Sequence, residues 1–129
     1  MACGGAPKSP DLLESAASWN ALAGEVVIER AKGSVPRAFT EESLEAVATG
    51  LGALAVQLDS ARDLDATSRG LAARDAREAA AAAHRLAALR DRPAPGEARL
   101  FSEAATRLHA LADRAKAAAP TGTNGPPGA

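Results

Sequence analysis

Residues 40–58, TEESLEAVATGLGALAVQL, carry the clearest helical pattern in this chain. Branched hydrophobic residues recur in this stretch at spacings of three and four, which places them on one face of an α-helix: Leu44, Val47, Leu51, Leu54 and Leu58. Thr40 precedes two glutamates, so we expect it to cap the helix, with Phe39 packing on Leu44 just outside it. A helix with one apolar stripe is stable only when that stripe is covered by other helices.

Three further segments show the same periodicity, each bounded by residues that interrupt a helix. Ser9 and Pro10 are a typical start for the first, and Gly33 and Pro36 a typical end. The core stripe predicted for the first of these segments is Leu12, Ala16, Trp19, Ala23 and Val26. The segment that begins near residue 66 has Leu64, Leu71, Ala82, Leu86 and Leu89, and the segment after the break at Pro93, Pro95 and Gly96 has Phe101, Ala104, Leu108, Leu111 and Ala115. We expect the third helix to run from about Ala66 to Arg90, after a turn with a cap at 63–65.

The composition predicts an all-α protein, because alanine and leucine favour helices and aromatic residues make up only 2% of the chain. Four helices of similar length with short connections favour an antiparallel up-down-up-down four-helix bundle. The alternative is a three-helix bundle, in which the second and third helices fuse through the turn at Asp63. We expect a flexible tether over 1–8, the helical domain over 9–119 and a disordered Gly/Pro tail over 120–129.

The net charge, the length of the apolar runs and the number of cysteines exclude several classes of protein. A net charge of −1 over 129 residues argues against a nucleic-acid-binding protein, which needs a basic surface to meet phosphates. No apolar run approaches the ~20 residues of a transmembrane helix, and a single cysteine allows no internal disulfide. As it stands, the chain is expected to be cytoplasmic.

Cys3 opens a second possibility. The residues after it are Gly4, Gly5, Ala6 and Pro7, and Ala2 precedes it. This order resembles the start of a mature bacterial lipoprotein, in which a lipidated cysteine precedes a small, flexible tether. The resemblance implies lipid on Cys3 and a periplasmic or cell-surface location, with membrane contact only through that lipid. The alternative is an unmodified cysteine in a disordered N-terminus.

The stretch from Ala46 to Leu58 contains no charged residue. Its core stripe does not account for the uncharged residues on the far side of the helix, where a surface helix normally carries charges. Small residues there would allow another backbone to approach closely. We therefore expect an interface with another protein or a second copy of this chain, formed by Ile28, Thr49, Gly52, Ala53 and Val56. The alternative is that this helix is central in the fold and simply buried.

The charges are segregated along the chain. Residues 1–65 hold five basic and ten acidic side chains, and residues 66–129 hold ten basic and six acidic. One interpretation is internal attraction, with an acidic helical pair beside a basic pair. The other is a basic face that meets an acidic partner and includes Arg69, Arg74, Arg77 and Arg85.

Two polar residues of the third helix are candidate functional groups. Asp75 falls within the predicted core arc, where a carboxylate needs a partner or a ligand. The alternative is a slight rotation of the helix that leaves Asp75 at the edge of the bundle. His84 falls opposite that arc and should be exposed. The order Ala83-His84-Arg85-Leu86 resembles a histidine phosphotransfer domain, a helical bundle whose exposed histidine accepts phosphate. In that family a lysine and a glycine follow, where this chain has Ala87 and Ala88.

The sequence contains no group of residues at a spacing typical of a catalytic or metal-binding site. We therefore expect no cofactor, no metal and no enzymatic activity. His109 has no methionine partner of the kind that haem-binding bundles use, because the only methionine is Met1. The sequence therefore predicts a non-enzymatic protein-interaction module. The alternative is a signalling or small-ligand-binding bundle that acts through His84 or Asp75.

Overall fold

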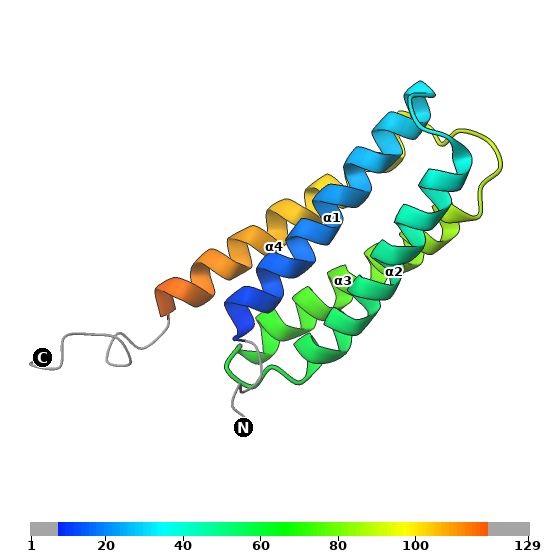
Figure 1. Cartoon of the computed structure of the whole chain (residues 1–129). Helices are drawn as coiled ribbons and strands as arrows, with labels where there is room; N and C mark the ends of the chain where they lie inside the picture. Colours follow the sequence, from blue (N-terminus) through cyan, green and yellow to red (C-terminus); the bar gives the residue numbers. More distant parts are fainter. Residues whose placement is uncertain (1–7, 119–129) are drawn as a thin grey trace, which may run out of the picture.

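A computed structural model describes residues 8–118, which form four α-helices (Figure 1). These are α1 (Ser9–Lys32), α2 (Arg37–Asp59), α3 (Ala66–Ala87) and α4 (Ala98–Ala118), with a short 3-10 turn, η1 (Pro95–Glu97), before α4. Successive helices run antiparallel, up and down the long axis of the molecule. The all-α, up-down-up-down four-helix bundle is confirmed. The three-helix alternative is wrong, because residues 60–65 separate α2 from α3.

The four helices form two closely packed pairs. α1 packs mainly against α4 and α2 mainly against α3, while contact between α1 and α2 joins the two pairs (Figure 1). α3 and α4 touch much less. The α3–α4 seam, where these two helices meet, is therefore the least closely packed contact between neighbouring helices of the bundle.

The predicted core stripes of α1, α2 and α4 are confirmed. Every member is buried except Trp19 and Ala115, which are partly buried against the core. The largest fully buried side chains are Phe101, Leu13, Leu44, Leu51, Leu58 and Leu108. One hydrophobic cluster thus draws on all four helices.

The stripe predicted for α3 is wrong in part. Leu71 and Leu89 are 41% and 37% exposed. The residues that α3 buries completely are alanines: Ala72, Ala73, Ala76, Ala79 and Ala83. α3 is therefore turned about a quarter of a turn from the leucine arc, with its alanine face inward. An alanine face lets two helix backbones approach closely, and the close α2–α3 contact follows from it. The helix also ends at Ala87, before the predicted Arg90.

Two predicted helix caps are also wrong. Lys8, not Ser9, is the N-cap of α1, and the buried Ser9 hydroxyl instead donates to the Asp63 carboxylate in the α2–α3 turn. α2 begins at Arg37 after Pro36, so Thr40 lies inside the helix, where its hydroxyl donates to the Pro36 carbonyl at 3.1 Å. In both cases the hydroxyl group that would cap the helix donates elsewhere: Ser9 donates to a distant part of the chain, and Thr40 donates to a carbonyl one turn earlier.

The other helix ends follow the sequence. Gly33 has φ of 80°, a left-handed conformation that favours glycine, and its N–H donates to the Arg30 carbonyl at 3.0 Å. Asp65 caps α3 by accepting from the Ser68 N–H at 3.1 Å. That hydrogen bond lowers the pKa of the Asp65 carboxyl group.

Gly50 provides the space for a contact between α1 and α2. A Cβ atom at Gly50 would lie 2.5 Å from Cε2 of the Trp19 indole, whereas a Cβ at Gly52 would meet nothing within 4 Å. Gly50 is thus needed for packing inside this chain. Gly52 is not.

We predict opposite effects from the two glycine-to-alanine substitutions. Gly52→Ala should raise the free energy of unfolding by about 0.5–1 kcal/mol, because alanine favours a helix where nothing obstructs it. Gly50→Ala should give no such increase, because the added Cβ would displace the Trp19 side chain. Chemical denaturation and the emission of Trp19, the only tryptophan, measure both. Equal stabilisation with unchanged emission would contradict the proposed Gly50–Trp19 contact.

Candidate functional site

The outer side of α2 is open to solvent. Thr49, Ala53 and Val56 are exposed, and Val56, at 67%, is the most exposed large hydrophobic side chain of the described residues. We call these three residues the α2 outer face. Gly52 borders it and is half-buried. The alternative, that this side of the helix is buried within the chain, does not hold for these three residues.

Ile28 is exposed but does not join the α2 outer face. α1 and α2 are antiparallel, with Trp19 opposite Gly50, so Ile28 lies roughly 22 Å along the bundle from the level of Val56. It also falls within roughly 40° of Glu14 around the helix. Because Glu14 bonds to α4, Ile28 lies on the side of α1 that faces away from α2.

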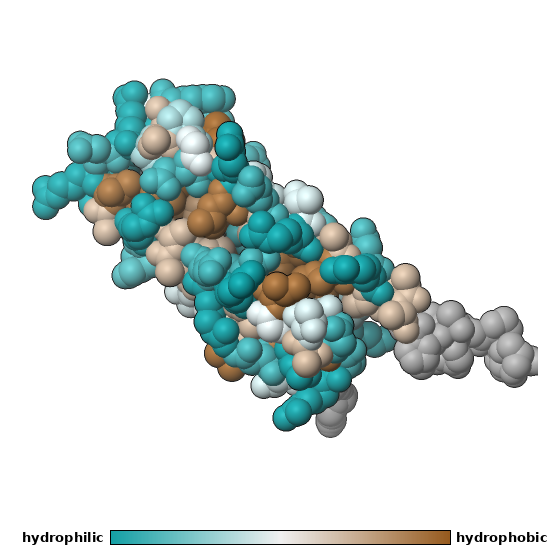
Figure 2. Space-filling view, turned by 180° about the vertical axis from the view of Figure 1, so that it is seen from behind, coloured by the Kyte–Doolittle hydropathy of each residue, from teal (hydrophilic) through white to brown (hydrophobic). Residues whose placement is uncertain are grey.

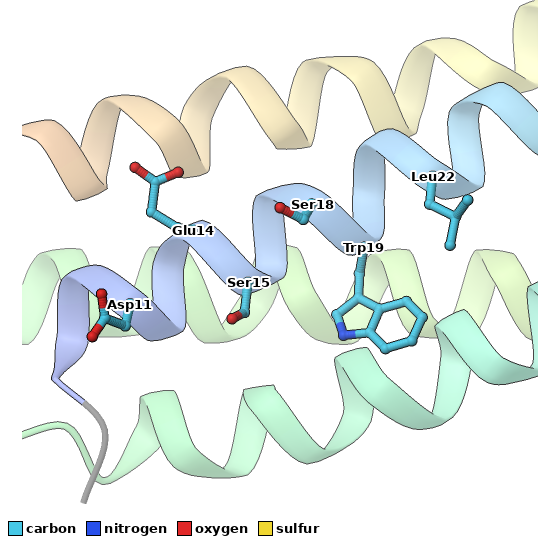
Figure 3. A pocket seen from close by; sticks show the side chains of 6 residues that line it. All are labelled: Asp11, Glu14, Ser15, Ser18, Trp19 and Leu22. Carbon is cyan, nitrogen blue, oxygen red and sulfur yellow. The ribbon is translucent and has the colours of Figure 1, made fainter.

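A shallow hollow lies along α1 (Figure 3). Its volume is about 460 Å³, and it is lined by Asp11, Glu14, Ser15, Ser18, Trp19 and Leu22. The Trp19 side chain points from α1 toward α2. Sequence reasoning missed this hollow because it assigned Trp19 wholly to the core.

Ion pairs join each acidic helix to a basic one. Between α1 and α4, Lys116 Nζ lies 2.9 Å from Glu14 Oε2, and His109 Nδ1 lies 2.8 Å from Glu14 Oε1. The hydrogen bond from Lys116 is the main reason that the pKa of Glu14 is lowered, and the same bond raises the pKa of Lys116. These pairs support the internal-attraction interpretation of the charge segregation.

Two more pairs join α2 to α3. Arg77 pairs with Asp59, and His84 Nδ1 lies 3.1 Å from Glu45 Oε1. Each of the two closely packed helix pairs thus combines opposite charges at its edge. Of the predicted basic residues, Arg69 instead donates to the Ala61 and Leu64 carbonyls, at 3.4 and 3.3 Å.

Asp75 is buried, as its position in the core arc predicts, and is only 5% exposed. Arg107 of α4 holds both of its oxygens, with Nε 2.9 Å from Oδ2 and Nη2 3.0 Å from Oδ1. This hydrogen bonding is the main reason that the pKa of Arg107 is raised. Asp75 therefore bridges the α3–α4 seam, and its oxygens are occupied by a side chain rather than open to a ligand.

His84 is exposed, as predicted, with 72% of its side chain accessible. Its Nδ1 is engaged by Glu45, whereas no hydrogen bond to Nε2 is formed among the described residues. Ala87, at the position of the lysine in the phosphotransfer motif, is buried and serves the packing of α3. Phosphotransfer through His84 stays a prediction.

The remaining predicted features are placed as follows. Cys3, most of the 1–8 tether and the 120–129 tail lie outside the described residues. Within residues 8–118, no three His, Cys, Asp or Glu side chains are grouped so that they could hold a metal ion. No helix in that range is both long and apolar enough to span a bilayer.

The chemistry available at the α2 outer face is that of packing. Ala53 and Val56 offer only alkyl groups and Thr49 a single hydroxyl group, and the adjacent Gly52 has no side chain to project from the surface. Such a surface is suited to contact with another protein backbone. Comparison with protein-family models, with curated proteins and with solved structures gives no match.

We predict that substituting Arg107 lowers the free energy of unfolding more than substituting Asp75. Arg107→Met should cost about 2–3 kcal/mol of unfolding free energy, because it leaves a buried carboxylate without a partner. Asp75→Asn should cost about 1 kcal/mol, since the half-exposed Arg107 can be solvated by water. Arg114→Met, on the same helix, is the control and should change little. Equal losses from the first two substitutions, measured by denaturation, would contradict this asymmetry.

Proposed function

We propose that this chain is a non-enzymatic protein-interaction module and that its α2 outer face binds a helix of another polypeptide. The observation that carries the proposal is the exposure of Val56 within a stretch, residues 46–58, that has no charge. This side of α2 therefore presents uncharged surface where the solvent side of a bundle helix normally carries charged residues.

The spacing of the face favours a helical partner. Thr49, Ala53 and Val56 follow one another by four and three residues, which makes a narrow stripe about 10 Å long on one helix. A partner helix can pack the ridges of its side chains between those of α2, and small side chains allow the two helix axes to come close. Val56 is the largest apolar side chain of this face, so we expect its burial to contribute more to binding than that of Thr49 or Ala53.

A matched pair of substitutions tests this proposal. Ala53→Glu places a carboxylate in the α2 outer face, and Ala110→Glu places one at an exposed alanine on the outside of α4. We expect Ala53→Glu to weaken capture of a partner from a cell lysate by about tenfold or more. Ala110→Glu should leave capture unchanged. If the two variants recover the same proteins in the same amounts, the α2 outer face is not the binding surface.

The proposal includes a lipid anchor on Cys3, supported only by the residues around that cysteine. Two acyl chains or more would be needed for stable anchoring, because a single chain binds membranes only marginally. We expect the N-terminal peptide of protein isolated from its native cell to carry added acyl mass on Cys3. An unmodified Cys3 peptide in the mass spectrum would remove the anchor from the proposal and leave the interaction module.

A further inference from the structure

The outward side of α1 carries a stripe of exposed residues that is uncharged in its middle. Its members follow one another by four and three positions, which places them on one line along the helix: Asp11, Ser15, Ser18, Leu22 and Glu25. We call this line the α1 outer stripe. Its middle coincides with the hollow of Figure 3, which the Trp19 side chain also lines. A carboxylate stands at each end of the stripe.

α2 carries a matching stripe that contains the α2 outer face. We call it the α2 outer stripe, and its exposed members also follow one another by four and three positions: Glu42, Ala46, Thr49, Ala53 and Val56. The helices are antiparallel, with Trp19 opposite Gly50. By that register, Glu42 lies within about one helical turn of the level of Glu25. The uncharged parts of the two stripes therefore lie at the same levels of the bundle, and we call the two stripes together the α1–α2 surface.

The α1–α2 surface has negative charge that the bundle leaves unpaired. Residues 9–29 and 38–59 contain eight carboxylates and no lysine, arginine or histidine. Five of the eight form ion pairs within residues 8–118: Glu14, Glu29, Glu41, Glu45 and Asp59. Asp11, Glu25 and Glu42 are exposed and form none in that range. The three unpaired carboxylates are thus the ones at the ends of the two stripes.

The outward sides of α3 and α4 have a different charge pattern. They expose carboxylates and arginines together that form no ion pair within residues 8–118: Glu78, Glu103, Asp113, Arg74, Arg99 and Arg114. Seen from behind, the molecule shows hydrophobic surface divided among hydrophilic side chains (Figure 2). The α1–α2 surface differs because its unpaired charges have one sign, and that sign limits what can dock on it.

We propose that the α1–α2 surface binds a helix of another polypeptide that has an uncharged, apolar stripe of about three turns with lysine or arginine at both ends. This inference rests on the proposed function and adds the charge and the length of the partner helix. The apolar stripe of the partner covers Leu22 and Ala53. Its basic ends meet Asp11 at one end and Glu25 and Glu42 at the other.

The length of the partner follows from the positions of the carboxylates. Asp11 and Glu25 lie on one helix 14 residues apart, which is about 21 Å. The basic groups of the partner are therefore about four helical turns apart. One helix buries less surface than the roughly 800 Å² per partner of a standard interface, so we expect a Kd on the order of tens of micromolar.

Charge also decides between classes of partner. A helix with acidic ends is repelled by the three unpaired carboxylates, whereas lysine and arginine pair with them. A second copy of this chain offers no surface of opposite charge, because the outward sides of α3 and α4 mix both signs. A foreign helix with basic ends is therefore the occupant that the charges of the α1–α2 surface favour.

Synthetic peptides test the proposal on the full chain. The probe is a helical peptide of about 20 residues with leucine along one face, glutamine on the other and two lysines at each end. One control peptide has glutamate in place of lysine, and a second has its four lysines in the two central turns. None contains tryptophan, so the emission of Trp19, the only tryptophan of the chain, reports binding.

We expect the probe to change the emission of Trp19 with a Kd on the order of tens of micromolar, and each control peptide to bind at least about tenfold more weakly. Raising NaCl to about 0.5 M should weaken binding of the probe, because salt screens exposed charges. Equal affinity for the probe and either control overturns the proposal, as does the absence of binding at about 1 mM probe.

Two triple variants with the same change in net charge separate this surface from the overall charge. One removes the unpaired carboxylates of the α1–α2 surface and the other removes those of α3 and α4: Asp11→Asn, Glu25→Gln and Glu42→Gln in the first; Glu78→Gln, Glu103→Gln and Asp113→Asn in the second. The first should weaken binding of the probe by about tenfold, since each exposed charge pair contributes a little. The second should leave binding unchanged. Equal losses would show attraction to the overall charge and overturn the docking surface.

A matched pair of leucine substitutions tests the apolar contact. Leu22 is 44% exposed on the α1 outer stripe, and Leu100 is 39% exposed on α4. Leu22→Ser should weaken binding of the probe by about fivefold, because burial of the exposed part of the leucine is lost. Leu100→Ser should leave binding unchanged. The same affinity in both variants overturns the proposed contact with the α1 outer stripe.

Two results distinguish failure of this inference from failure of the proposed function. If the probe does not bind while Ala53→Glu still weakens capture, the charge assigned to the partner is wrong and the α2 outer face remains a binding surface. If the chain alone sediments as more than one copy at the titration concentrations, and the first triple variant does not, the occupant is a second copy and the assignment to a foreign helix is overturned.

Discussion

The close packing of α3 on α2 is the contact on which the other features of this bundle depend. The inward side of α3 is built almost entirely of alanine, so its backbone comes close to α2. Turning that alanine face inward carries Leu71 to the edge of the helix and brings the exposed His84 within 3.1 Å of Glu45 on α2. It also draws α3 toward α2 rather than α4, which explains why α3 and α4 are less closely packed.

Electrostatics reinforce the same arrangement. An acidic helix lies against a basic one in both close pairs, with ion pairs such as Glu14–Lys116 and Asp59–Arg77 at their edges. The two remaining contacts join helices of like charge and need another source of stability. Between α1 and α2 this stability comes from the Trp19 indole packed against Gly50. Between α3 and α4 it is the Asp75–Arg107 pair, whose buried carboxylate makes separation of these helices costly.

The sequence was sufficient for features that depend on local pattern. Leucines at helical spacing predicted the buried face of α2, and Gly33 and Asp65 predicted two helix ends, because each acts within one or two turns. The α3 prediction failed because it weighted leucine over alanine, although a row of alanines is what permits the closest helix approach. The burial of Asp75 was predictable from its own helix, whereas its partner lies 32 residues away and was not.

The candidate site shows the same division between local and long-range information. That residues 46–58 carry surplus uncharged residues was visible in the sequence, and Thr49, Ala53 and Val56 are exposed. Ile28 could not be assigned correctly, because its side of α1 is defined only once α4, rather than α2, is known to lie there. The hollow along α1 could not be predicted for a similar reason, because it depends on how the Trp19 side chain packs against Gly50 of α2.

The two glycines of α2 separate what the fold needs from what it does not. Each costs the helix roughly 1 kcal/mol relative to alanine. At Gly50 that cost is offset by packing, because the missing side chain leaves space for the Trp19 indole. At Gly52 nothing lies within 4 Å of the missing Cβ, so no contact in residues 8–118 offsets it. Gly52 borders the α2 outer face, where Val56 also exposes apolar surface without benefit to the core. Both residues are unfavourable for an isolated bundle, and contact of this side of α2 with another polypeptide gives one physical reason for both.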